Sequence, residues 1–231
     1  MPRLPTRSGT KRRRVERSET KTAKKNIGRR LPLNGFPSSK MVRLRYVQEI
    51  SMSGATGTTN VFRANSLYDP DMTGVGSQPA NFDRWMNIYD HYTVIGAKMT
   101  VQYAPTTTTD QNPGYVGIYL SDDGLFTSTA SVSSLMEQKK NADFPRIIGF
   151  GEQIPDPLVM YFSAKKFFGK PVNTIIGDGT YRGTSSANPT EGAFFELYQK
   201  AVGGNTPGTF NYLVTIDYIA VLTEPKEDED A

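Results

Sequence analysis

The chain has 231 residues and no cysteine, which excludes a disulfide-stapled module and any metal or redox site built on thiolates. Its length fits one large domain plus a tail, and 12 Tyr and 12 Phe supply enough apolar surface for a packed core. No run approaches the roughly 18 apolar residues that cross a bilayer, and no apolar segment follows the basic N-terminus, so we expect neither a membrane span nor a signal peptide.

The net charge of +4 is divided unevenly along the chain. Residues 1–45 contain 15 Lys or Arg and two acidic residues, whereas residues 46–231 contain 12 Lys or Arg and 21 acidic residues. The last eight residues, EPKEDEDA, form an acidic tail over 224–231. The positive charge therefore belongs to one segment at the N-terminus and not to the whole molecule.

Residues 1–39 combine this basic charge with four prolines and almost no apolar periodicity. Such a segment cannot bury enough surface to offset its ordering entropy, so we predict a disordered arm whose natural partner is a polyanion. The candidate nucleic-acid contacts in the arm are Arg3, Arg7, Lys11, Arg12, Arg13, Arg14, Arg17, Lys21, Lys24, Lys25, Arg29 and Arg30. Eight of them also have the composition of a nuclear localisation signal, namely Lys11, Arg12, Arg13, Arg14, Lys24, Lys25, Arg29 and Arg30.

From residue 41 the hydrophobic pattern has period two, which predicts a half-buried strand. Val42, Leu44 and Tyr46 share one face of this strand, and Arg43 and Arg45 share the other. If the arginine face looks toward the arm, both side chains extend the basic surface onto the folded domain. An ordinary solvated strand face explains them equally well.

Further strands are expected along the rest of the chain, to a total of about eight. The strongest patterns cover 58–65, 95–103, 114–121 and 210–222, and weaker ones cover 145–150, 158–164 and 193–200. In the pattern of 95–103, Ile95, Ala97 and Met99 share one face. Loops rich in Gly, Ser, Thr, Asn and Pro join the strands, for example over 104–113 and 177–191.

One segment, NFDRWMNIYDHY at 81–92, has a different period. Its large apolar residues Phe82, Trp85, Tyr89 and Tyr92 recur at intervals of three and four, and Asn81 precedes them as an N-cap candidate. This pattern predicts a short amphipathic helix whose aromatic stripe packs into the core. An all-β chain with one short helix points to a two-sheet jelly roll over residues 40–223.

No catalytic constellation is found in the sequence. His91 is the only histidine, and we expect it at the surface or at a helix end rather than in a triad or a metal site. Asp69 and Asp71, and likewise Asp122 and Asp123, lack the spacing of a calcium loop and fit turns. We therefore expect no enzyme activity, no cofactor and no bound metal.

Residues 62–101 carry a resemblance to a known family. FRANSLYDPD, followed by TGVGSQPANFDRWMNIYDHYTVIGAKMTV, resembles the capsid proteins of circovirus-like viruses with circular single-stranded DNA genomes. In that family a block of this form joins early strands of the viral jelly roll, and the basic arm and total length are similar too. The arms of circoviruses proper are denser in arginine than this one, which mixes in Lys, Thr and Ser.

The resemblance implies a sixty-subunit icosahedral shell that packages single-stranded DNA, found in the virion and, during assembly, in the host nucleus. Its further partners would be the nuclear import machinery and a host-cell receptor. A satellite-like capsid that packages single-stranded RNA is the nearest alternative, because Lys and Arg contacts to phosphate do not distinguish the two sugars. A cellular nucleic-acid-binding β-sandwich fits less well, because the cations lie on the tail rather than on the domain. An enzyme or carbohydrate-binding jelly roll leaves the arm unexplained.

Overall fold

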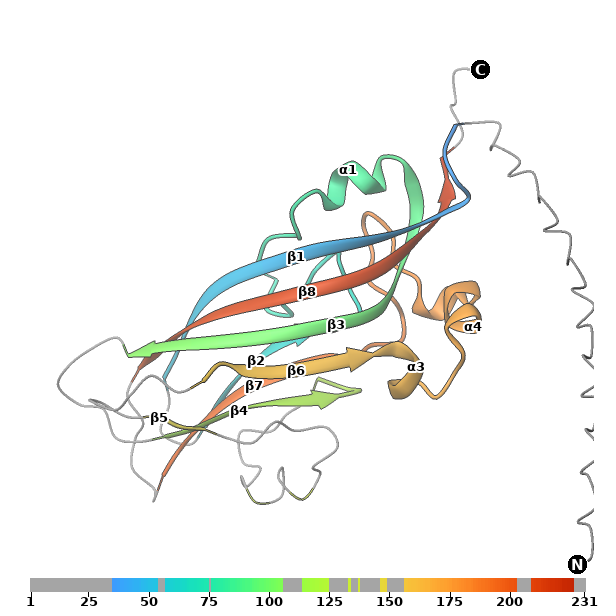
Figure 1. Cartoon of the computed structure of the whole chain (residues 1–231). Helices are drawn as coiled ribbons and strands as arrows, with labels where there is room; N and C mark the ends of the chain where they lie inside the picture. Colours follow the sequence, from blue (N-terminus) through green and yellow to red (C-terminus); the bar gives the residue numbers. More distant parts are fainter. Residues whose placement is uncertain are drawn as a thin grey trace, which may run out of the picture. The chain divides into compact units, whose positions relative to one another are not determined.

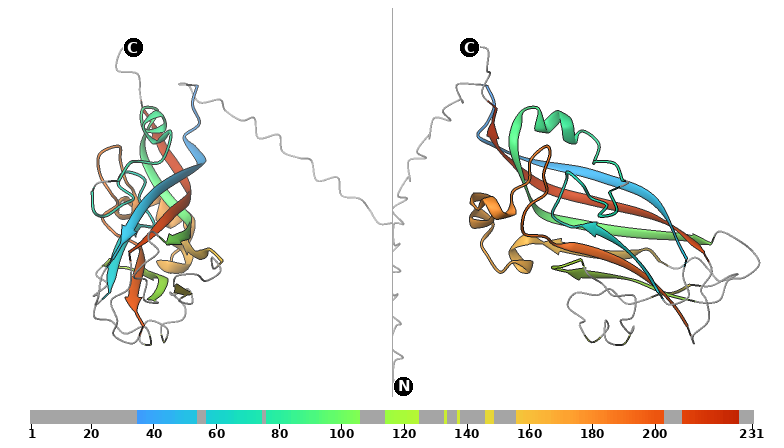
Figure 2. Two further views of the ribbon diagram at one scale, coloured as in Figure 1. Left: turned by 90° about the vertical axis from the view of Figure 1, so that its left-hand side faces the viewer. Right: turned by 180° about the vertical axis from the view of Figure 1, so that it is seen from behind.

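The structure is a computed structural model that describes residues 35–53, 57–74, 76–105, 114–124, 133, 137, 146–148, 156–202 and 209–226. In these residues, eight strands form two four-stranded antiparallel sheets that face each other (Figure 1, Figure 2). The strands are β1 (Ser39–Met52), β2 (Thr58–Arg63), β3 (Tyr89–Pro105), β4 (Gly114–Ser121), β5 (Arg146–Ile148), β6 (Leu158–Ser163), β7 (Phe194–Ala201) and β8 (Phe210–Pro225). The first sheet has the order β1-β8-β3-β6, and the second has the order β2-β7-β4-β5.

The eight strands predicted from the sequence are all present. The first sheet is built on β8, which pairs with β1 from Ser39↔Thr223 to Met52↔Phe210 and with β3 on its other side. The alternation expected in β1 is confirmed, because Val42, Leu44 and Tyr46 are buried while the residues between them are exposed. The weaker patterns correspond to β5, β6 and β7.

Buried tyrosines connect the two sheets across the core. On β8, the hydroxyl of Tyr218 donates to the carbonyl of Arg63 on β2 at 2.8 Å, and the hydroxyl of Tyr212 donates to Oε1 of Gln199 on β7 at 2.9 Å. Burial raises the pKa of both phenols above the ordinary value. Each ring thus contributes apolar area to the core while its hydroxyl has a partner in the opposite sheet.

The helix predicted over 81–92 is wrong in its length. Helix α1 covers only Phe82–Met86, and β3 begins at Tyr89 because its backbone pairs with β8 there. Asn81 occupies the N-cap position, as predicted, with φ 67°, but it makes no side-chain capping hydrogen bond. The spacing of three and four is local, and the pairing with β8 overrides it. Phe82 and Met86 are the buried residues of α1, and Trp85 packs against the core while half-buried.

A β-bulge in β3 changes the face on which two residues lie. The register against β8 shifts between Val94 and Gly96, so that Val94 is buried while Ile95, expected on the same face as Ala97, is only half-buried. A bulge inserts one unpaired residue and so reverses the alternation on one side of it. After the bulge, Ala97 and Met99 are buried as expected.

Three short helical segments after β6 were not predicted. They are α3 (Ala164–Phe167), α4 (Val172–Gly177) and η1 (Gly179–Tyr181), the last within the stretch expected as a loop. Aromatic rings hold this region against the first sheet, since Phe168 lies 6.0 Å from Phe162 of β6 and 4.6 Å from Tyr181 between ring centroids. Each segment is too short to show a helical period in the sequence.

The strand order identifies the architecture. Two facing antiparallel sheets, each mixing strands from distant parts of the chain, form a jelly roll, the fold of viral capsid and lectin domains. The fold class predicted from the sequence is therefore confirmed.

Candidate nucleic-acid interface

Of the fourteen nucleic-acid contacts predicted from the sequence, the twelve in the arm lie outside the described residues, as does the predicted localisation signal. Arg43 and Arg45 are described, and both are exposed on β1. Their side chains point away from the core, on the outer face of the first sheet. This face is therefore the part of the predicted interface that the structure describes.

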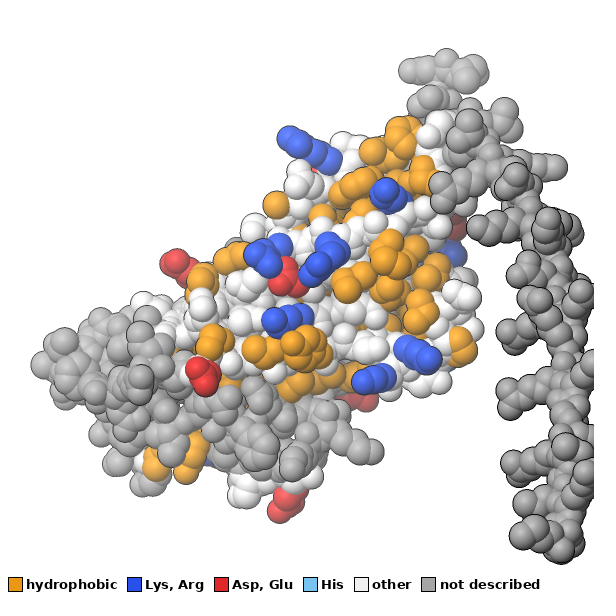
Figure 3. All heavy atoms as spheres, viewed as in Figure 1, with side chains coloured by type: hydrophobic (Ala, Val, Ile, Leu, Met, Phe, Trp, Pro, Cys, Tyr) orange, Lys and Arg blue, Asp and Glu red, His pale blue; other side chains and the backbone are white. Residues whose placement is uncertain are grey.

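One row of side chains crosses the whole outer face of the first sheet. Arg45 of β1 is in register with Asp217 of β8, which is in register with Lys98 of β3. Lys98 is in turn in register with Tyr161 of β6. We call Arg45, Asp217, Lys98 and Tyr161 the central row. Figure 3 shows Lys and Arg side chains over the middle of this face, with hydrophobic side chains around them.

Arg45 and Asp217 form a two-point ion pair at one end of the central row. Nε of Arg45 donates to Oδ1 of Asp217 at 2.7 Å, and the second guanidinium nitrogen donates to Oδ2 at 3.0 Å. These hydrogen bonds, together with the carboxylate charge, raise the pKa of Arg45 above its ordinary value. The pair orients the guanidinium, while the Arg45 side chain stays 64% exposed and open to a further anionic partner.

Lys98 and Tyr161 occupy the other end of the row. The Lys98 amino group lies 5.7 Å from the centroid of the Tyr161 ring, within the range of a cation–π contact. Tyr161 is 66% exposed, the highest exposure among the large hydrophobic side chains in the described residues. Sequence reasoning missed it, although the burial of Leu158, Met160 and Phe162 on alternate positions of β6 places Tyr161 on the outer face.

The same face carries further exposed apolar side chains. Met41 and Val47 come from β1, and Leu213 and Ile219 come from β8. In the row next to the central row, toward the start of β1, Arg43 is in register with Ile219. The face thus mixes cations with apolar groups, a combination that suits contact with another macromolecule better than plain solvation.

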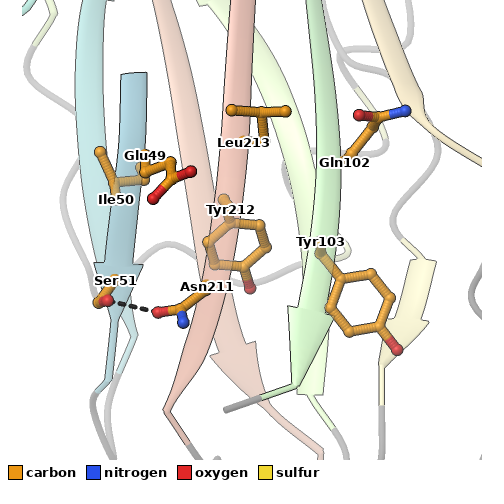
Figure 4. A pocket seen from close by; sticks show the side chains of 8 residues that line it. All are labelled: Glu49, Ile50, Ser51, Gln102, Tyr103, Asn211, Tyr212 and Leu213. Atoms are coloured by element: carbon orange, nitrogen blue, oxygen red, sulfur yellow. Dashed lines mark hydrogen bonds between the residues drawn. The ribbon is translucent and has the colours of Figure 1, made fainter. Parts of the chain in front are cut away.

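A shallow pocket of about 580 Å³ lies where β1 and β3 end and β8 begins. Figure 4 shows that β1, β3 and β8 all contribute to it. Its lining includes Glu49, Gln102 and Asn211, and the Ser51 hydroxyl donates to the Asn211 side chain. Glu49 is the charged residue of this lining, so the pocket does not extend the cationic surface.

His91, Arg182 and Glu224 form a small polar cluster. His91 lies on β3, and its Nε2 is 3.3 Å from Oε2 of Glu224 on β8. The guanidinium of Arg182 donates to the other oxygen of Glu224 at 2.7 Å. The His91 side chain is 31% exposed, so it reaches the surface as expected, but it lies on a strand and not at a helix end, because the strand begins earlier than predicted.

The aspartates considered as calcium ligands hold the backbone in place. Asp69 accepts a hydrogen bond from the guanidinium of Arg63 at 2.6 Å. Asp71 is buried and accepts from the backbone N–H of Thr73 at 3.0 Å, a turn contact, and from the Gln48 side chain of β1 at 2.7 Å. The turn chemistry expected from the sequence is present, and Asp71 additionally joins its turn to the first sheet.

The second aspartate pair, Asp122 and Asp123, is exposed in the turn that follows β4. Gly124 closes this turn at φ 63°, with its N–H donating to the Ser121 hydroxyl at 3.2 Å. Within the described residues, no group of three or more His, Cys, Asp or Glu side chains is placed to hold a metal ion. The helices described are all too short or too polar to span a membrane.

No protein-family model matches the chain, and no curated protein matches its sequence. Several solved virus structures have a similar fold. The alignment with the empty head of turnip yellow mosaic virus covers 87% of this chain and 89% of the virus chain, with TM-score 0.46 and 13% identity. The alignment with tobacco necrosis virus covers 82% of this chain and 97% of the virus chain, with TM-score 0.44 and 13% identity. The alignment with mud crab tombus-like virus covers 99% of this chain and 95% of the virus chain, with TM-score 0.45 and 12% identity. At such identities the similarity concerns the fold alone.

Proposed function

We propose that this chain is a viral capsid protein, whose jelly roll forms a closed shell and whose basic arm binds the packaged genome. The observation that carries the proposal is the separation of charge and fold along the chain. Residues 1–39 hold 12 Lys or Arg and two acidic residues, and β1 begins at Ser39, where this segment ends. A jelly roll supplies walls for lateral contacts, and a cationic segment at its first strand supplies counter-charge for phosphate.

The chemistry of the arm fits a sequence-tolerant contact with nucleic acid. Lys and Arg side chains that neutralise phosphates release counterions, so binding depends steeply on salt and little on base sequence. Residues 46–231 have an excess of acidic residues. The arm is therefore the part of the chain suited to hold the genome, with Arg43 and Arg45 as its continuation onto the domain.

We further propose single-stranded circular DNA as the cargo, in a shell of sixty copies assembled in the host nucleus. Support for DNA comes from the resemblance of residues 62–101 to circovirus-like capsid proteins. That block runs from β2 through α1 into β3, and so joins early strands of the jelly roll, as the resemblance implies. The basic clusters of the arm would act as the nuclear localisation signal during infection.

The arm can be tested by deleting residues 1–34, which leaves β1 and its pairing with β8 intact. We expect the shortened protein to keep its β circular-dichroism spectrum and to lose most of its binding to a single-stranded oligonucleotide. The full chain should bind with a logarithmic salt slope of about −0.7 per phosphate contacted. As a matched control, Lys165→Gln with Lys166→Gln removes two exposed cations from the body and should leave the slope nearly unchanged. Equal binding and equal slope in the deletion variant would contradict the role of the arm.

The cargo can be tested on particles purified from cells that replicate the virus. Electron microscopy should show uniform closed shells, and the nucleic acid extracted from them should be digested by DNase and by a nuclease specific for single strands. Resistance to DNase with sensitivity to RNase would contradict the DNA proposal and leave the capsid proposal standing. Absence of closed shells would contradict both.

A further inference from the structure

We propose that the central row is a second nucleic-acid contact, in which Tyr161 stacks on an unpaired base and Lys98 and Arg45 bind the adjoining phosphates. This inference rests on the proposed function and names a site for it within the folded domain. It predicts that the genome touches the inner wall of the shell at a defined place as well as the arm. It also assigns the outer face of the first sheet to the interior of the shell.

The exposure of Tyr161 is the first step of the argument. Its neighbours on β6, Met160 and Phe162, are buried in the core, so the domain does not need the Tyr161 ring for its own packing. The ring belongs to a strand at the edge of the sheet and is 66% exposed. An exposed aromatic face next to a cation is the arrangement by which proteins hold single strands without sequence preference.

The cations around the ring form the second step. The Lys98 amino group lies 5.7 Å from the ring centroid, near enough to meet the phosphate of a nucleotide whose base covers the ring. Arg45 on β1 lies three strand spacings from Tyr161 on β6, or about 14 Å at about 4.8 Å per strand. Asp217 holds the guanidinium of Arg45 from one side and leaves it exposed on the other. A nucleic-acid strand that crosses the sheet along this row therefore meets Arg45 at one end and Lys98, beside Tyr161, at the other.

The direction of the chain supplies the third step. Arg43 and Arg45 follow four and six residues after Ser39, the first residue of β1, so the cations of the face continue the cationic segment that precedes it. At about 3.3 Å per residue, Arg43 lies only about 13 Å from the start of the strand. The first cations of the face thus lie close in the chain to the point where the cationic segment joins β1.

The charge of the face argues against a second copy of the chain as its partner. The central row and the adjacent position hold three cations, Arg43, Arg45 and Lys98, and one anion, Asp217. A two-fold contact between two such faces would bring the same cations of both copies together. A polyanion has the complementary charge, and its bases can cover the apolar ring of Tyr161.

Binding of the full-length protein to a short oligothymidylate tests the stacking contact, with an abasic strand of equal length as the second probe. We expect Tyr161→Ala and Tyr161→Leu to weaken oligothymidylate binding about 5- to 150-fold, because stacking on one base is worth about 1–3 kcal/mol. The abasic strand should bind all Tyr161 variants equally, and Tyr161→Phe should bind both probes like the wild type. Lys98→Gln should weaken both probes and lower the salt slope by about 0.7, because it removes one phosphate contact.

Ultraviolet crosslinking in purified particles provides an independent measurement. After digestion with trypsin, nucleotide should be attached to the peptide of residues 147–165, which contains Tyr161, and Tyr161→Leu should abolish this adduct. Unchanged binding by Tyr161→Ala and Tyr161→Leu together with no adduct would overturn the inference. Equal losses on the two probes would also overturn it. So would a defect in shell assembly in Tyr161→Ala that Tyr161→Leu restores without any change in nucleic-acid binding, because the face would then contact protein. A wild-type protein that binds neither probe would refute the proposed function itself.

Discussion

Replacement of Tyr92 by phenylalanine removes one hydroxyl from a buried chain of hydrogen bonds. The backbone N–H of Tyr68 donates to this hydroxyl at 3.2 Å, and the Ser66 hydroxyl lies 2.8 Å from it. Ser66 donates its single proton to Oδ1 of Asn188 at 2.6 Å, so the Tyr92 hydroxyl is the donor to Ser66. The chain connects β3 to the turn after β2 and to the segment that precedes β7.

The expected cost follows from the groups that lose their partner. Phenylalanine keeps the ring and its edge contact with Phe82, with centroids 5.6 Å apart, so no cavity forms. The Tyr68 N–H and one acceptor site of Ser66 lose their partner, and Ser66 is fully buried while Tyr68 is partly buried. Leaving a buried donor or acceptor unsatisfied costs about 1–3 kcal/mol, and for a domain of this size each kcal/mol lowers Tm by about 2–4 °C. We therefore expect a Tm lower by about 2–12 °C.

Thermal and urea unfolding of the unassembled protein, followed by circular dichroism, measures this effect, with light scattering to verify that both samples are in the same assembly state. Tyr161→Phe is the matched control, because it removes the same atom from an exposed ring and should change the free energy of unfolding by less than about 0.5 kcal/mol. An unchanged free energy of unfolding in Tyr92→Phe, with an unchanged m value, would show that the hydroxyl chain does not stabilise the domain.

Two further predictions concern the same core. Gly183→Ala should destabilise the protein by about 1–3 kcal/mol, because the new Cβ would lie 2.2 Å from Cζ of Tyr92; Gly177→Ala, whose Cβ meets nothing within 4 Å, is the control, and equal stability of the two variants in urea would contradict the model of a closed contact. Alkaline titration should show cooperative unfolding above about pH 10, the pKa of an unfolded tyrosine. Burial raises the pKa of Tyr212 and Tyr218 in the folded state, so their contribution to stability is present below pH 10 and is lost as the pH rises. Absorbance at 295 nm and circular dichroism should change together, and complete tyrosine ionisation with an intact β spectrum would refute this reasoning.

The sequence predicts the strands well because burial on one face of a strand forces a period of two. In β1 and β8 that period extends over long runs, and the residues expected inside, such as Leu44 and Tyr218, are buried. The prediction fails at 87–92, where an aromatic spacing of three and four also fits a helix. There the choice is made by pairing of β3 with β8, a contact between residues more than a hundred positions apart.

The candidate site was predictable only in part for the same reason. Alternation alone puts Arg43 and Arg45 on an outward face, without saying what stands beside them. The central row depends on the registers of three strand pairs, and a slip of one residue in any of them would send its side chains to the other face. Lys98, Asp217 and Tyr161 are therefore brought into one row only by the register that the fold sets.

The place of β8 between β1 and β3 has a consequence for the order of folding. Among the described strands, β1 pairs with β8 alone, so Ser39 meets its partner Thr223 only after all the intervening chain has been synthesised. Until then the first strand lacks its ladder, and closing so large a loop makes such a sheet slow to form. During this interval the arginines of β1 are not yet aligned with Lys98 and Tyr161. A nascent chain thus presents its cationic segment well before the first sheet is complete, and the two parts of the proposed nucleic-acid surface form at different times.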